Sequence, residues 1–379
     1  MALAQCAERR LGAAQRLSRD WSRTDYGCEG VMEVLVPALV AIVVGKPVIR
    51  ALARLNIRQT IYAYAPETHR AKEGTPTMGG FIMLLAVAGG LIALVIVSNA
   101  PAFSALFLIR PLPLASHIMP MLGLFGAVLL FALLGFVDDY LVRRWLGRRG
   151  LEWKIKLLLQ LFAVSVALYA FIDVPVQLVR DSAQNLLAVR DVTLGTPYWL
   201  LALVWVVGWV NAFNLTDGLD GLAAGLSVIA FGVLAAICRD ALVVVTALLW
   251  CGAALGYLWW NFHPARVFMG DTGSMALGAT FGLVTWREIT LVALAPSPTT
   301  PIQQAMIFTL VGLVFAVEII SVVIQLSAVK LLKRRLFRAT PIHHHFELLG
   351  WGENHIVGRF WLVGALAGLT AYTLSGGLR

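Results

Sequence analysis

Charged side chains are scarce in this chain of 379 residues, because Asp, Glu, Lys and Arg together make up only 13% of it. A soluble domain carries about 25% charged residues, so the composition excludes an ordinary soluble protein. Hydrophobic residues make up 59% of the chain, and the mean hydropathy is +0.80. Apolar runs of about 20 residues are long enough to cross a bilayer as helices. The composition therefore predicts an integral membrane protein.

The chain also lacks a cysteine pattern and a strand pattern. Its four cysteines, at positions 6, 28, 238 and 251, have neither disulfide nor metal-site spacing, so we expect no structural disulfide. The apolar runs do not alternate as the strands of an outer-membrane barrel would. We therefore predict an all-α polytopic membrane protein.

Ten apolar stretches predict about ten transmembrane helices. They cover residues 34–49, 79–97, 118–136, 157–172, 199–210, 222–237, 241–258, 275–294, 305–326 and 356–374. Residues 1–31 are polar and have no continuous apolar segment of the signal-peptide type. We read them as an amino-terminal extension without an assigned role, and residues 32–379 as a single integral membrane domain.

The net charge of +9 would suit nucleic acid as a partner, but the positive residues lie in short loops between apolar stretches. There they set the topology, and we expect no nucleic-acid partner. One set of alternate loops holds eighteen Lys and Arg residues and the other holds six. The positive-inside rule therefore predicts that the first set is cytoplasmic.

Five unusual polar motifs all fall on this predicted cytoplasmic side. They are APETHRAKEGTPTMGG (65–80), GFVDDY (135–140), NAFNLTDGLDGLAAG (211–225), NFHPARVFMGDTGS (261–274) and PIHHHFELLGWGENH (341–355). Functional groups commonly sit on loops that a rigid scaffold positions. The motifs together predict one active site at the cytoplasmic face of the membrane.

Three aspartates in these motifs suggest a cation site. Asp138 and Asp139 follow an apolar helix at its carboxyl end, where the helix dipole disfavours anions. They are either solvated surface acids or the partners of a divalent cation or basic loop. Asp271 lies between Gly270 and Gly273, and it either caps the next helix or binds a metal or phosphate. A set of oxygen ligands favours magnesium over zinc.

Other polar groups stand beside or within apolar stretches, where they need partners or a water-filled cavity. The central motif places two amides and two acids directly after the apolar run 200–210; these are Asn211, Asn214, Asp217 and Asp220. His343, His344 and His345 are consecutive and diverge in direction, which favours contacts with phosphate over a metal site. Interfacial polar residues are the alternative. Glu318 lies deep within a predicted span, where buried pairing or a helix break would explain it.

The order TPTMGG, GFVDDY, NAFNLTDGLDGLAAG, VFMGDTGS and PIHHHFELLGW resembles the polyprenyl-phosphate N-acetylhexosamine-1-phosphate transferase superfamily. The resemblance runs from about residue 45 to the carboxyl terminus, and PIHHHFE resembles the branch that handles MurNAc-pentapeptide. It implies transfer of phospho-MurNAc-pentapeptide from UDP-MurNAc-pentapeptide to undecaprenyl phosphate, with release of UMP. It further implies Mg²⁺ as cofactor, a homodimer, contact with membrane lipid, and a place in the bacterial plasma membrane.

The resemblance also assigns roles to individual residues. It implies that Asp271 binds magnesium and that Asp138, with its neighbour Asp139, orients or deprotonates the lipid phosphate. We expect direct attack by that phosphate, with a covalent phospho-aspartate as the alternative. His344 is the fourth residue with an implied catalytic role. The residues implied to bind substrate are Lys72, Lys156, Asn211, Asn214, Asp217, Gly218, Leu219, Asp220, Asn261, Phe268, His343 and His345. Among these, Lys72, Gly218, Leu219, Asp220 and Phe268 match a uracil pocket, with Phe268 stacked on the base.

One position departs from the family pattern, because a lysine is common after GFVDDY where this chain has Leu141, Val142 and then Arg143. Two other functions remain open. The sugar nucleotide could be UDP-GlcNAc, which PIHHHFE disfavours. A transporter could also carry intramembrane acids and histidines, but it would place them near mid-span, and no inverted repeat is evident.

Overall fold

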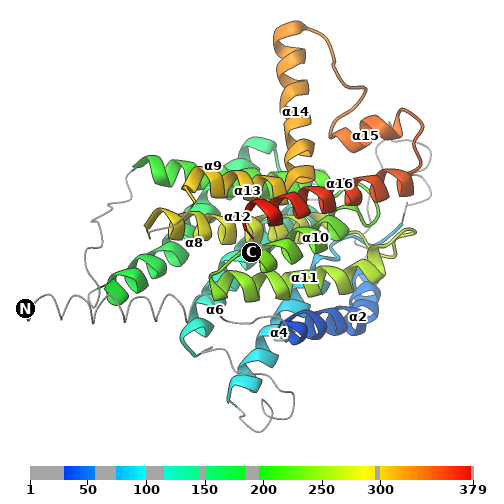
Figure 1. Ribbon diagram of the computed structural model, residues 1–379. Helices are drawn as coiled ribbons and strands as arrows, with labels where there is room; N and C mark the ends of the chain where they lie inside the picture. Colours follow the sequence, from blue (N-terminus) through cyan, green and yellow to red (C-terminus); the bar gives the residue numbers. More distant parts are fainter. Residues whose placement is uncertain are drawn as a thin grey trace, which may run out of the picture.

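The computed structural model describes residues 30–55, 74–99, 115–142, 144, 150–183, 196–294 and 299–376. Within these ranges the chain forms twelve α-helices and one π-helical turn, without a β-strand (Figure 1). The all-α prediction is confirmed. Residues 1–29 of the amino-terminal extension, Lys72 and Arg143 lie outside the described residues.

The helices follow one another along the chain as α2 (Val31–Arg54), α4 (Gly80–Asn99), α6 (Ala115–Phe136), α8 (Trp153–Ala183), α9 (Thr196–Thr216), α10 (Leu222–Ile237), α11 (Ala241–Asn261), α12 (Gly270–Leu294), α13 (Pro301–Val311), α14 (Leu313–Leu332), α15 (Ile342–Glu347) and α16 (Glu353–Leu374). The π-helical turn η1 (Val137–Leu141) follows α6 directly. Seven of the described helices are long and apolar enough to cross a membrane, and α10 and α13 are shorter apolar helices. The chain is therefore a multi-pass integral membrane protein.

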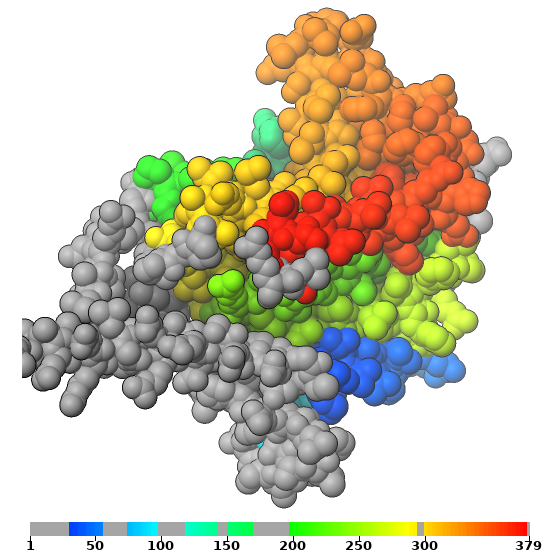
Figure 2. All heavy atoms as spheres, in the orientation of Figure 1, coloured from blue at the N-terminus to red at the C-terminus, as the bar shows by residue number. Residues whose placement is uncertain are grey.

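The ninth predicted span is wrong as a single helix, because residues 305–326 divide at Gly312 into α13 and α14. A Cβ atom at Gly312 would lie 2.4 Å from the Trp209 ring of α9. Glycine thus lets Trp209 occupy the corner between the two helices. Beyond this corner α14 turns away from the bundle and protrudes from the packed helices (Figures 1 and 2). The other nine predicted stretches each coincide with one helix.

Helix α12 lies at the centre and packs against α9, α6, α4 and α13. Its contact with α9 is aromatic, because the ring centroids of Trp209 and Phe281 are 4.5 Å apart. Helix α9 also contacts α14, where Phe213 stacks on Phe315 at 3.7 Å. Aromatic pairs at such separations add to the free energy gained by burying their area. The α9–α12 contact is therefore a rigid base for the residues at the ends of both helices.

Helices α2 and α11 approach closely through small residues. Gly252 and Gly256 are one turn apart on α11, and Cβ atoms there would lie 2.2 Å from Val34 O and 2.3 Å from Ala38 O of α2. Small residues spaced four apart allow backbones to pack directly, as is common between membrane helices. The interface holds α11 in place, and the loop from α11 to α12 leads to Asp271.

Candidate active site

The site begins where α6 changes into η1. This π-helical turn carries Asp138 and Asp139, both 7% exposed. Single π turns inside α-helices occur often at functional sites. Gly135, one turn earlier, lets the end of α6 approach the start of α12, because a Cβ atom there would lie 2.4 Å from the Asp271 carbonyl group. The two acidic motifs thereby come together.

Lys156 of α8 joins these motifs. Its Nζ lies 2.5 Å from Asp271 Oδ2 and 3.0 Å from Asp138 Oδ2. The Lys156 side chain is 17% exposed and the Asp138 side chain 9%. Charges buried in this way are stable only when they are paired and hydrogen-bonded. One ammonium group therefore compensates two carboxylates that come from η1 and from α12.

Asn214 at the end of α9 completes the cluster. Its Nδ2 donates to Asp271 Oδ1 at 2.8 Å and to Ser274 Oγ at 2.9 Å, while its Oδ1 accepts from Lys156 Nζ at 3.1 Å. One turn earlier, Asn211 donates to the Gln160 side chain of α8 at 2.8 Å. The two amides therefore tie α9 to both α8 and α12. We refer to Asp138, Lys156, Asn214 and Asp271 as the four-residue cluster.

Asp139 has a different position from its neighbour Asp138. Its Oδ2 accepts from Thr272 N at 3.3 Å and from Thr272 Oγ1 at 3.4 Å. Thr272 is in the first turn of α12, where free N–H groups and the helix dipole stabilise an anion. Asp139 also faces Gly270, whose φ of +71° suits glycine. Asp139 thus anchors η1 to the start of α12.

The turn after α9 carries Asp217, Gly218 and Leu219. Burial and, after it, the negative charge of Asp271 raise the pKa of Asp217 to about 7. Gly221 closes the turn with a φ of +76°, a conformation that other residues rarely adopt. Its N–H donates to Asn261 Oδ1 at 3.0 Å. A carboxyl group that titrates near neutral pH beside the four-residue cluster is a candidate functional group.

Two predicted substrate-binding side chains take part in bonds within the protein. Asp220 Oδ2 accepts from Ala265 N at 3.1 Å and lies 2.9 Å from His263 Nδ1. Asn261 donates from Nδ2 to Val267 O at 2.9 Å, in addition to accepting from Gly221. Both residues therefore shape the turn after α9 and the loop from α11 to α12. Phe268, in that loop, is half-buried, and its backbone carbonyl accepts from Gly79 N at 2.7 Å.

The three consecutive histidines have three different environments. His343 is fully buried, and its Nδ1 lies 3.1 Å from Glu318 Oε1 of α14. His344 Nδ1 lies 2.6 Å from Glu347 Oε2, one turn later in α15. His345 Nδ1 accepts from Arg338 N at 3.1 Å. Each Nδ1 thus lies beside a different neighbouring residue of the chain.

The four-residue cluster is suited to a divalent cation. One oxygen of Asp138 and one of Asp271 lie around a single positive group, the Lys156 ammonium, and Asn214 adds an amide oxygen at 3.1 Å from it. Carboxylate and amide oxygens are hard donors, which Mg²⁺ prefers. The residues present therefore fit the magnesium ion that the sequence suggested.

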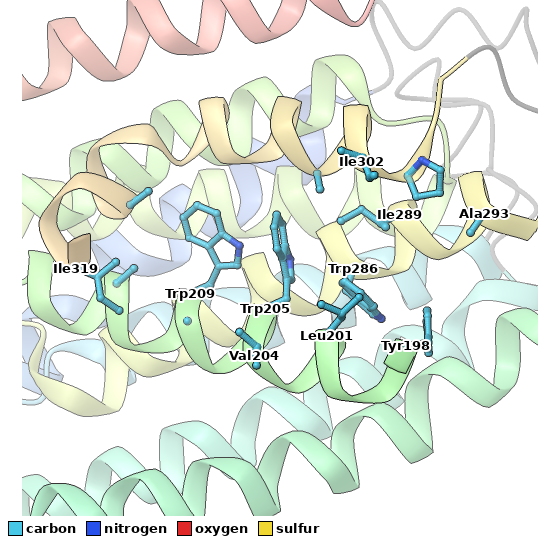
Figure 3. A pocket seen from close by; sticks show the side chains of 15 residues that line it. Tyr198, Leu201, Val204, Trp205, Trp209, Trp286, Ile289, Ala293, Ile302 and Ile319 are labelled. Carbon is cyan, nitrogen blue, oxygen red and sulfur yellow. The ribbon is translucent and has the colours of Figure 1, made fainter. Parts of the chain in front are cut away.

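A separate apolar cavity of about 600 Å³ lies between α9, α12, α13 and α14 (Figure 3). Trp205, Trp209 and Trp286 line it together with aliphatic side chains, and none of the described residues that line it is a carboxylate, a lysine or a histidine. A phosphate would find no charged partner there, so this cavity is distinct from the candidate active site.

The structure thus brings together the cluster residues and places Asp139, Asn211 and Asp217 around them. It shows polar neighbours that motif reading did not single out: Gln160, Ser274, His263 and Glu353. Glu353 Oε1 accepts from Asp220 N at 2.7 Å across a separation of 133 residues. Only its place within the GWGENH motif could have drawn attention to it.

Comparison with known proteins agrees with this geometry. Residues 121–288 match the description "Glycosyl transferase family 4". The chain is 34% identical over 340 residues to a phospho-N-acetylmuramoyl-pentapeptide-transferase of Staphylococcus epidermidis, which covers 88% of this chain and 96% of that relative. A protein of the same name from Staphylococcus aureus is 35% identical over 343 residues, or 89% and 93% of the two chains. The chain therefore belongs to glycosyl transferase family 4 and is a membrane-embedded polyprenyl-phosphate hexosamine-1-phosphate transferase.

Proposed function

We propose that this protein transfers phospho-MurNAc-pentapeptide from UDP-MurNAc-pentapeptide to undecaprenyl phosphate, releasing UMP. The observation that carries the proposal is the contact of Lys156 with Asp138 and Asp271, which brings together η1 and the first turns of α8 and α12. Phosphoryl transfer between a soluble diphosphate and a lipid phosphate needs positive charge and a cation site at a membrane surface. The cluster meets both requirements.

In this proposal Asp271 and Asn214 hold the magnesium ion, which supplies positive charge to the pyrophosphate when it is bound. Lys156 stabilises the negative charge that spreads over the phosphoryl oxygens. Asp138 orients the lipid phosphate, which is itself a competent nucleophile, so the attack is direct. Asp139 keeps η1 on α12. A phospho-aspartate trapped at position 138 or 139 would refute direct attack.

The turn at 217–221 and Phe268 form the nucleotide side of the proposed site, and Lys72 belongs to it by its match to the uracil pocket of the family. His344 and His345 face the phosphates or the sugar-peptide. The proposal of MurNAc-pentapeptide over GlcNAc rests on PIHHHFE and on the names of the staphylococcal relatives. We further propose that the protein lies in the bacterial plasma membrane as a homodimer, with the site facing the cytoplasm.

The substrate assignment is tested with purified protein, magnesium and undecaprenyl phosphate. UDP-MurNAc-pentapeptide and UDP-GlcNAc are supplied in separate reactions, and UMP release is measured. We expect release with the first substrate only. Release with UDP-GlcNAc alone would assign the chain to the other branch, and release with neither would refute the proposal.

The metal assignment is tested with Asp271→Ala. We expect this variant to remain folded and extractable but to lose turnover at every magnesium concentration, because a main ligand is missing. Thermal unfolding in detergent provides the control for folding. Normal magnesium-dependent turnover in the variant would remove Asp271 from the metal site.

A further inference from the structure

Helix α14 buries three polar side chains along one side. Glu318, Ser321 and Gln325 follow each other at helical spacing and are 0%, 3% and 8% exposed. By contrast, Val317, Ile320 and Ile324 are 42%, 51% and 41% exposed. Because α14 protrudes from the bundle (Figures 1 and 2), these apolar side chains face the surroundings. The polar side must therefore meet another part of the same chain.

That part is the segment from residue 336 to α15. The Gln325 side chain accepts from Leu336 N and Phe337 N, both at 3.0 Å, and donates to Phe337 O at 2.9 Å. Two turns earlier on the helix, Glu318 meets His343 at 3.1 Å, with both side chains fully buried. Helix α14 thus contacts this segment at two points, through Gln325 near residue 336 and through Glu318 at His343.

The Glu318–His343 contact differs from the Gln325 contacts because both of its side chains are fully buried. An isolated carboxylate in an apolar interior is very costly. Within the described residues neither the Glu318 oxygens nor the His343 ring nitrogens make a hydrogen bond, and the 3.1 Å approach of His343 Nδ1 to Glu318 Oε1 is an ion-pair contact. Each residue therefore depends on the other for electrostatic compensation of its buried polar group. When the second nitrogen of a histidine has such a carboxylate partner, the orientation of the ring is fixed.

The opposite edge of the His343 ring reaches the turn after α9. A Cβ atom on Gly218 would lie 2.3 Å from His343 Nε2, so the ring packs directly against the Gly218 backbone. Glycine is required at this point by the close approach. His343 therefore connects α14 to the turn that carries Asp217, and α15 holds His344 beside it.

We infer that Glu318 is a positioning residue: through His343 it sets α15 and the turn at 217–221 in the arrangement that the transfer reaction needs. This inference rests on the proposed function. It also changes the expected role of His343 from a residue that binds substrate to one that positions α15 and the turn at 217–221. In the proposal, His344 and His345 remain the residues that face the substrate. Glu318 itself touches neither substrate nor metal in this arrangement.

The test compares Glu318→Leu, Glu318→Gln and Ser321→Ala in the full-length protein. Leucine removes the partner of His343, and we expect kcat for UMP release to fall about 100-fold, as small displacements of catalytic groups do. The KM for the sugar nucleotide should change little, because Gly218 N keeps its own bond to Thr216 O at 2.9 Å. Glutamine keeps the size of the side chain and a polar oxygen beside His343 Nδ1, so it should restore most of the lost rate.

Ser321→Ala is the matched control, since the Ser321 hydroxyl donates to Glu318 O within its own helix. It should retain wild-type kcat. A merely structural role for Glu318 predicts less folded protein with unchanged kcat per folded molecule, and that result would overturn the inference. So would a Gln variant as inactive as the Leu variant.

Hydrogen exchange gives a readout that is independent of substrate. Backbone amides of residues 336–347 should exchange faster in Glu318→Leu than in wild type or Ser321→Ala, because one of the two attachments to α14 is lost. Unchanged exchange would refute the positioning role. If wild-type protein released no UMP from either sugar nucleotide, the proposed function would fail. The exchange measurement would then be the remaining test of whether the Glu318–His343 pair holds residues 336–347 in place.

Discussion

The Lys156 ammonium lies 2.5 Å from Asp271 Oδ2, although 115 residues separate the two along the chain. The contact joins the start of α8 to the start of α12 and brings Asp138 into the same group at 3.0 Å. Three charged residues from three elements thus form one polar centre at the end of an apolar bundle. The chemistry proposed for the protein depends on this centre.

Replacing Lys156 by methionine tests the centre directly. The variant keeps the length of the side chain but removes the charge that faces Asp138 and Asp271, so both carboxylates lose this cationic partner. We expect kcat for UMP release to fall about 100- to 1,000-fold, the usual effect of removing one electrostatic stabiliser. Lys154→Met is the control, because Lys154 is exposed and stands over the Trp153 ring at 5.8 Å. Equal activity of the two variants would contradict the assignment.

Gly135→Ala tests whether the approach of α6 to α12 matters. The added Cβ would lie 2.4 Å from the Asp271 carbonyl group, where backbone cannot easily move. We expect a loss of about 1–3 kcal/mol in the free energy of unfolding and a reduced kcat. Gly126→Ala on the same helix has nothing within 4 Å of its new Cβ and should be stabilised by about 1 kcal/mol. Thermal unfolding and UMP release of both variants check this, and equal melting temperatures would contradict it.

Asp217 should make stability depend on pH. Its pKa is raised to about 7 by burial and by the charge of Asp271, whereas an unfolded aspartate titrates at about 3.9. Between these values the folded state holds a proton that the unfolded chain has lost. The free energy of unfolding therefore falls as the pH rises through this window, and it levels off above it.

Asp217→Asn removes this contribution, since an amide has no proton to lose in that range. In metal-free buffer the melting temperature of the wild type should decline between pH 4 and pH 7, and that of the variant should decline less. The variant should also be the more stable of the two at pH 8. Parallel pH profiles would show that Asp217 is ionised normally.

A second buried ion pair lies away from the four-residue cluster and should affect stability alone. Arg287 of α12 donates from Nε and Nη2 to the two oxygens of Asp240, at 3.1 and 3.0 Å. Asp240 also caps α11 by accepting from Val243 N at 3.2 Å. Arg287→Met breaks the pair and should cost about 3–5 kcal/mol in the free energy of unfolding.

The control for this variant is Arg239→Met, whose exposed side chain should contribute little. Arg287→Met should lower the melting temperature strongly, while kcat per folded molecule stays near that of the wild type. A large fall in kcat at an unchanged melting temperature would show that the ion pair influences the site.

Much of the fold could be predicted from the sequence, because apolar runs long enough to span a bilayer allow few structures other than helices. Nine of the ten predicted stretches coincide with single helices. The division at Gly312 could not be predicted, since residues 310–317 are apolar on both sides of it. It arises because Trp209, about 100 positions earlier, fills the corner.

The candidate site was predictable as a set of residue types and only in part as a set of contacts. The motifs that hold Asp138, Asn214 and Asp271 were evident, because polar groups at the ends of apolar runs are costly without partners. The partners themselves come from distant positions, as with Glu353 and Asp220. Sequence alone could not separate Asp138, which faces Lys156, from the adjacent Asp139, which caps α12.

The amino-acid sequence by itself determined that this chain enters a membrane as helices and that its polar motifs require partners. Both follow from the free energy of placing apolar and charged groups in water or hydrocarbon. Only the tertiary structure decided which group partners which: Lys156 with two aspartates, and buried Glu318 with His343. Those choices depend on helix ends and close glycine contacts, which bring together residues that are distant in the chain.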